Sequence, residues 1–175
     1  SDRGMKDLLA AADSDELDRN LRANALKVAA LQQRELGQDD AAAESLTKLE
    51  RLSGREGLRP ADLLWLARYY ADQGEHRRVA AYCIPLITAD SDAPPRFRAE
   101  AFLLSGNSFR EVGQYQDAID SYREAVRLPE GFGGYARLEL ARTYARMGNV
   151  DEALSEFEDL AYRFPADIAA PALYH

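Results

Sequence analysis

The hydrophobic positions of residues 99–128 follow the spacing of two helices separated by a glycine. Phe102, Leu103 and Phe109 recur at helical intervals before Gly113, and a second helical stripe follows that glycine. A glycine at such a break is typical of a helix end, because it adopts a positive φ without steric cost. The stripe of the second helix consists of Tyr115, Ala118, Ile119, Tyr122, Ala125 and Val126. The pattern predicts a helical hairpin.

The same hairpin pattern recurs over residues 134–163, at an offset of about 35 residues. Gly106 corresponds to Ala141, and Tyr122 corresponds to Phe157. A small residue opposite an aromatic ring lets two helices pack closely, so we expect both aromatics in the interior. A hairpin of this size cannot bury its apolar face alone and must stack on its neighbours.

This ordered set of small and bulky positions, present twice in tandem, resembles the tetratricopeptide repeat. Weaker copies precede it, so the resemblance extends over roughly residues 23–165. It implies an all-α fold, an α-solenoid of tandem helix-turn-helix repeats that form a right-handed superhelix. The predicted organisation is an N-terminal helical flank at 1–22 and a repeat array at 23–175, with units at about 23–59, 60–98, 99–133 and 134–166 and a truncated unit at 167–175.

Further helices are predicted upstream of the repeats. Residues 5–12 and 17–36 have helical spacing, and Asp13 to Asp15 are the expected break and N-cap. The only cysteine, Cys83, occupies an apolar position of its helix and cannot form an internal disulfide. We expect it to be a small buried hydrophobic residue rather than a reactive thiol.

Composition narrows the possible functions. The 175 residues carry a net charge of −8, and clustered Lys and Arg are scarce, so nucleic-acid binding is not expected. No apolar run is long enough to insert into a membrane. The sequence leaves the compartment open between the cytoplasm and a bacterial periplasm or cell envelope.

The sequence offers no constellation for catalysis or metal binding. The only histidines, His76 and His175, are far apart, and neither lies in a metal-ligand spacing. The sequence contains no nucleophile, base and orienting group in a pattern typical of an active site. We therefore expect that the protein is not an enzyme and binds no cofactor and no metal.

The resemblance implies that the first helix of each unit lines a concave groove. The predicted partner-binding residues are Leu64, Trp65, Arg68, Leu103, Asn107, Arg110, Tyr135, Leu138, Arg142 and Arg146. Their arginines can bind carboxylates through paired N–H donors, and their apolar members can anchor a peptide. The competing interpretation is that Trp65 and the leucines merely pack between units.

The predicted function is a non-catalytic protein–protein interaction scaffold. Its groove would bind a peptide or helical segment with carboxylates and a few apolar anchors. Two alternatives stay open. The chain could self-associate through the end that carries Ile168, Leu173 and Tyr174, or it could be a regulatory repeat region of a larger, possibly bacterial cell-envelope, protein.

Overall fold

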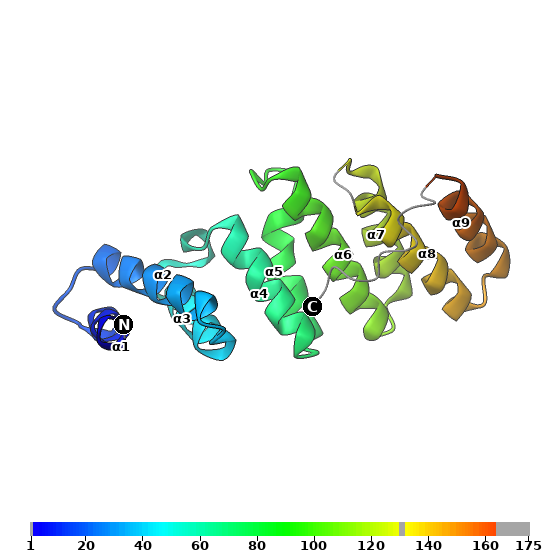
Figure 1. Ribbon diagram of the computed structural model, residues 1–175. Helices are drawn as coiled ribbons and strands as arrows, with labels where there is room; N and C mark the ends of the chain where they lie inside the picture. The colour runs from blue at the N-terminus through cyan, green and yellow to red at the C-terminus, as the bar shows by residue number, and fades with distance from the viewer. Residues whose placement is uncertain (1, 130–131, 164–175) are drawn as a thin grey trace. The chain divides into compact units, whose positions relative to one another are not determined.

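The computed structural model describes residues 2–129 and 132–163, and every regular element in these ranges is a helix (Figure 1). The helices are α1 (Asp2–Asp13), α2 (Arg19–Glu35), α3 (Asp39–Ser53), the short 3₁₀ helix η1 (Arg55–Gly57), α4 (Pro60–Asp72), α5 (His76–Ile87), α6 (Pro95–Glu111), α7 (Tyr115–Arg127), α8 (Gly133–Met147) and α9 (Val150–Arg163). The all-α, helix-turn-helix architecture predicted from the sequence is confirmed. The truncated unit predicted at 167–175, with Ile168, Leu173 and Tyr174, lies outside the described residues.

A glycine with positive φ closes each of four helical hairpins: α2–α3, α4–α5, α6–α7 and α8–α9. Gly113 (φ 79°) follows α6 as predicted, and Gly148 (φ 81°) is its counterpart after α8. The residue after the glycine donates its backbone N–H to a carbonyl in the last turn of the preceding helix. After Gly113, Gln114 N donates to Phe109 O at 2.8 Å. These turns satisfy carbonyl groups that a helix end otherwise leaves unpaired.

The chain divides into two compact units, Ser1–Tyr69 and Tyr70–His175. Within the first unit, α1 packs on α2 and α2 packs on α3. Within the second, helices from α5 to α9 pack on one another in sequence order, and α6 also contacts α8 (Figure 1). The second unit therefore buries its apolar faces by stacking successive helices.

The core of the second unit contains the small-against-aromatic packing predicted for Gly106. A methyl group added at Gly106 would lie 2.5 Å from Cε1 of Tyr122, whose side chain is completely buried. Tyr144 from α8 packs in the same core, with Leu103 and Ile119. Gly106 thus allows α6 and α7 to approach closely.

Two local predictions are wrong. The N-cap of α2 is Asp18 rather than a residue between Asp13 and Asp15, because the Asp18 carboxylate accepts from Asn20 N at 2.7 Å and Leu21 N at 2.9 Å. Phe157 is not an interior residue, because 39% of its side chain is exposed. Its counterpart Tyr122 is fully buried, because its ring packs against Gly106 of α6 and shares a core cluster with Leu140 and Tyr144 of α8.

Cys83 lies in the interior of the second unit, as predicted. It is fully buried in α5, and burial raises the pKa of its thiol to about 12, although a hydrogen bond with Ser105 acts in the opposite direction. A thiol with so high a pKa is a poor nucleophile at neutral pH.

Candidate functional site

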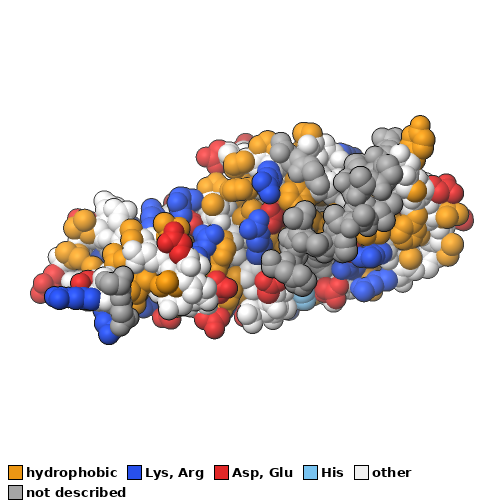
Figure 2. Space-filling model, in the orientation of Figure 1, with side chains coloured by type: hydrophobic (Ala, Val, Ile, Leu, Met, Phe, Trp, Pro, Cys, Tyr) orange, Lys and Arg blue, Asp and Glu red, His pale blue; other side chains and the backbone are white. Residues whose placement is uncertain are grey.

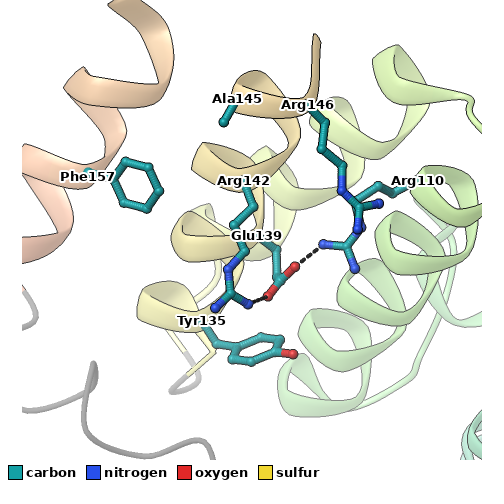
Figure 3. A pocket seen from close by; sticks show the side chains of 7 residues that line it. All are labelled: Arg110, Tyr135, Glu139, Arg142, Ala145, Arg146 and Phe157. Atoms are coloured by element: carbon teal, nitrogen blue, oxygen red, sulfur yellow. Dashed lines mark hydrogen bonds and ion pairs between the residues drawn. The ribbon is translucent and has the colours of Figure 1, made fainter. Parts of the chain in front are cut away.

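A pocket of about 470 Å³ lies in the second unit, where side chains of α6, α8 and α9 converge (Figure 3). Most of its lining comes from one face of α8, and α6 and α9 contribute one residue each. The lining residues are Arg110, Tyr135, Glu139, Arg142, Ala145, Arg146 and Phe157. Three guanidinium groups therefore share one pocket with two aromatic rings.

The spacing of the sequence along α8 explains this convergence. Tyr135, Glu139, Arg142 and Arg146 are separated by steps of three or four residues, which places them on one face of the helix. Arg110 lies in the last turn of α6 and reaches the same face from the neighbouring helix. The pocket is thus a product of helix periodicity and of the α6–α8 contact.

Glu139 is the electrostatic centre of the pocket. Its carboxylate is only 2% exposed and accepts hydrogen bonds from both Arg110 Nη1 and Arg142 Nη1, the latter at 2.7 Å (Figure 3). A buried carboxylate requires such partners, because an unpaired charge in the interior is very costly. Glu139 therefore fixes the two arginines relative to each other.

Glu111 joins the cluster at the end of α6. Its carboxylate accepts from Arg110 at 3.2 Å and lies 3.8 Å from Arg146 Nη1. Burial lowers the pKa of Arg110, but Tyr122, Glu139 and Glu111 outweigh burial and raise it overall. Arg110 is therefore firmly cationic and held in place.

Arg142 and Arg146 are the open part of the cluster. Their side chains are 56% and 53% exposed, and neither has a partner among the described residues beyond the contacts given above. Most of their N–H donors are thus available to an incoming carboxylate or peptide carbonyl. Phe157 and Tyr135 supply apolar surface beside them (Figure 3).

Burial also raises the pKa of Tyr135, and the nearby Glu139 acts in the same direction, while Arg110 and Arg142 oppose it. The phenol therefore stays neutral at physiological pH and can donate a hydrogen bond.

The structure brings four of the predicted site residues together in this pocket: Arg110, Tyr135, Arg142 and Arg146. Asn107 lies on α6 and accepts a hydrogen bond from the Tyr122 hydroxyl at 2.8 Å, which ties it to the core. Leu138 is half-buried on α8 and does not line the pocket.

Leu103 and Leu64 belong to the interior rather than to a surface. Their side chains are 1% and 2% exposed, so a partner cannot contact them.

The two remaining predicted residues, Trp65 and Arg68, lie in the first unit. Trp65 is half-buried, and its indole stacks on Tyr69 at a centroid separation of 5.6 Å. The guanidinium of Arg34 lies 4.9 Å from the centroid of the same indole, which is a cation–π contact. Arg68 is exposed.

The predicted site residues did not include Glu139 and Phe157 of the pocket. Glu139 reads as a solvated surface acid, and only its spacing of three residues from Arg142 hints at an ion pair. The sequence predicts Phe157 in the interior, because an aromatic ring opposite a small residue lets two helices pack closely.

Two further features are absent from the described ranges. No group of His, Cys, Asp or Glu side chains among them is arranged to hold a metal ion. No helix in the described part of the chain combines the length and apolarity needed to cross a membrane.

Comparison with known proteins supports the helical-repeat interpretation. Residues 109–174 match the family model described as tetratricopeptide repeat, which confirms the resemblance inferred from the sequence for that part of the chain. No curated protein matches the chain closely enough to count as a relative.

Two solved structures share the fold of this chain. A structure of MamA AMB-1 has a TM-score of 0.68 and 20% sequence identity, over 97% of this chain and 90% of that one. A second structure of MamA has a TM-score of 0.66 and 16% identity, over 98% of both chains. The chain therefore shares the fold of these two structures, which over the described residues is built from helices alone.

Proposed function

We propose that this protein is a non-catalytic scaffold that binds an acidic segment of a partner protein in the pocket between α6, α8 and α9. The observation that carries the proposal is the pair Arg142 and Arg146. Both expose more than half of their side chains beside Phe157 in a pocket that already holds a fixed cation, Arg110. Such a mixture of arginine and aromatic surface is characteristic of binding hot spots.

The charge balance indicates what the partner presents. The pocket lining holds three arginines and one glutamate, in a chain whose net charge is −8. Glu111 offsets one more positive charge from the rim. The excess of positive charge in the pocket is small, so one carboxylate of the partner is sufficient to balance it. Apolar contacts must then supply the rest of the affinity.

A peptide-display selection with the whole chain tests the proposal. We expect the selected peptides to carry Asp or Glu next to an aromatic or aliphatic residue. The double variant Arg142→Ala/Arg146→Ala should then bind the selected peptides at least tenfold more weakly, because each arginine–carboxylate hydrogen bond contributes about 1.5–3 kcal/mol.

The matched control is Arg77→Ala/Arg127→Ala, which removes two exposed arginines of the same unit outside the pocket. It should keep the affinity of the unmodified chain. Equal losses in both variants would show that net charge, not the pocket, governs binding. Selected peptides without acidic residues would contradict the proposed partner chemistry.

A further inference from the structure

Helix α2, in the first unit, carries large apolar side chains on its solvent-exposed side. The row, called here the α2 stripe, consists of Leu21, Val28 and Leu31, with the exposed Asn24 between the first two. The exposed fractions of Leu21, Val28 and Leu31 are 52%, 42% and 47%. Figure 2 shows hydrophobic side chains at the surface over this part of the chain.

The α2 stripe is not needed for the packing of the unit. The interior face of α2 is formed by other residues: Ala23, Ala25, Leu26, Ala29, Ala30 and Gln33. Helical geometry places the α2 stripe opposite that face, where a surface helix normally carries polar residues. Three large apolar side chains in this position point to a partner.

The spacing of the α2 stripe matches a helix-binding seam. Leu21, Asn24, Val28 and Leu31 are separated by steps of three, four and three residues, the a/d pattern with which one helix packs along another. A single asparagine in an otherwise apolar seam is a known means of fixing the register of two helices. Leu21 and Leu31 are ten positions apart, so the stripe is about 15 Å long. A partner helix of about three turns would cover it.

One edge of the α2 stripe is basic. Lys27 and Arg34, seven residues apart, lie along the same edge and are both partly exposed. Lys27 has no partner within the described residues, and Arg34 lies 3.7 Å from the buried Asp62. An acidic side chain on the partner helix would complement this edge, as charges flanking a helix seam commonly do.

The same charges disfavour a second copy of this chain as the occupant. If two α2 helices packed antiparallel, the two basic edges would face each other. If they packed parallel, Lys27 would face the neutral residue Gln32 of the second copy. Neither arrangement places an acidic side chain of the second α2 against Lys27, which has no partner of its own among the described residues.

An anionic lipid surface is disfavoured as well. The chain has a net charge of −8, and acidic residues lie at both ends of α2, at Asp18 and Glu35.

We therefore propose that the α2 stripe docks an amphipathic helix of another protein that carries acidic residues along one edge. This surface lies in the first unit and is distinct from the pocket of the second.

Two designed peptides of 21 residues test the proposal by fluorescence anisotropy with the full chain. Both carry leucine at the a and d positions of a heptad, apart from one asparagine that can pair with Asn24. One peptide has glutamate and the other lysine at the e and g positions. We expect the glutamate peptide to bind at least tenfold more tightly. The triple variant Leu21→Gln/Val28→Gln/Leu31→Gln should lose this binding, and Lys27→Glu should narrow the difference between the peptides.

The matched control is Leu154→Gln, which replaces an apolar residue of α9 that is 56% exposed and should leave binding unchanged. Equal affinity for both peptides, or unchanged binding by the triple variant, would overturn the proposal. So would a concentration-dependent dimer in ultracentrifugation that the triple variant abolishes. Cosedimentation with phosphatidylserine vesicles that depends on the α2 stripe would overturn it in favour of a membrane surface.

Discussion

At the scale of single residues, Gly106 controls how closely α6 and α7 approach. The space that a methyl group would need is occupied by the ring of Tyr122, with Cε1 at 2.5 Å and Cδ1 at 2.7 Å. That ring is fully buried, and its hydroxyl donates to Asn107 at 2.8 Å, so it has little freedom to move aside. The packing of the second unit therefore depends on the absence of a side chain at one position.

We expect Gly106→Ala to destabilise the protein by about 1–2 kcal/mol. Overpacking a core costs about 1–3 kcal/mol, and the better helix propensity of alanine returns at most about 1 kcal/mol. Denaturant unfolding monitored by circular dichroism measures the change.

The contact with Tyr122 can be tested by a double-mutant cycle. If the clash is the cause, Gly106→Ala/Tyr122→Leu should be more stable than the sum of the two single changes predicts. Strict additivity would mean that the loss arises elsewhere.

Cys83 makes stability sensitive to alkaline pH. Its pKa is raised from 9.0 to about 12 by burial, so the folded state holds the thiol proton where the unfolded chain releases it. The stabilising effect of the raised pKa is complete below pH 9 and is lost as pH rises towards 12. Between pH 8 and pH 10, we expect the free energy of unfolding to fall by about 1.4 kcal/mol from this group alone.

The reference for this measurement is Cys83→Ala, which retains all other titrating groups. The variant should show a shallower decline over the same pH interval, and the difference between the two curves isolates the thiol. Parallel curves for the two proteins would show that the thiolate is not excluded from the folded state.

At the scale of helices, Asp18 begins α2 and so positions the helix that carries the α2 stripe. Its carboxylate satisfies two backbone N–H groups that would otherwise lack partners at the helix start. Asp15 also lies before α2, but it only makes an ion pair with Arg22, at 3.1 Å, and its side chain is 95% exposed.

We expect Asp18→Ala to reduce stability by about 1 kcal/mol, because it removes the N-cap. Asp15→Ala should cost at most about 0.5 kcal/mol, since exposed ion pairs contribute little. Thermal unfolding of both variants separates the two positions. A larger loss of stability for Asp15→Ala than for Asp18→Ala would mean that Asp15, in the segment predicted from the sequence, is the N-cap.

The helices themselves could be predicted from the sequence because their signals are local. Apolar spacing, the turn glycines at Gly113 and Gly148 and the small residue at Gly106 all act through near neighbours in the chain. The pocket was only partly predictable. The arginines of α8 share a visible periodicity, but the burial of Glu139 depends on Arg110, which lies 29 residues earlier in the sequence.

Phe157 is a second position whose environment the sequence did not predict correctly, here because the expected burial is not found. Its position opposite a small residue predicts burial, and the equivalent Tyr122 is fully buried, but Phe157 is 39% exposed. Burial of Tyr122 depends on its contacts with α6 and on core residues of α8, and the composition of α7 alone does not contain that information. Neighbour-dependent features of a repeat therefore require the structure.

At the scale of the whole molecule, the protein is acidic but places two exposed arginines, Arg142 and Arg146, in one pocket. A strongly acidic partner would experience long-range repulsion from a chain with a net charge of −8. A partner with one carboxylate beside apolar anchors would meet much less repulsion and could still use Arg142 and Arg146. The overall charge thus favours mixed acidic and apolar segments over acidic tails.

The two compact units also bear on how the molecule unfolds. Each unit has its own buried residues, among them Leu49 in the first and Leu103 in the second, with exposed fractions of 0% and 1%. Stability in a repeat protein is approximately a sum of local terms and neighbour interfaces. A cavity in one unit should therefore weaken that unit most.

Leu49→Ala and Leu103→Ala form a matched pair that tests this expectation. Each should cost about 2–5 kcal/mol, because each removes a buried leucine side chain. Native-state hydrogen exchange should then show faster exchange of α2 and α3 amides in the first variant and of α6 to α8 amides in the second. Since α4 (Pro60–Asp72) crosses the unit boundary, some acceleration should pass to the other unit, but less. Equal acceleration throughout the chain in both variants would mean that the molecule opens as a single cooperative unit.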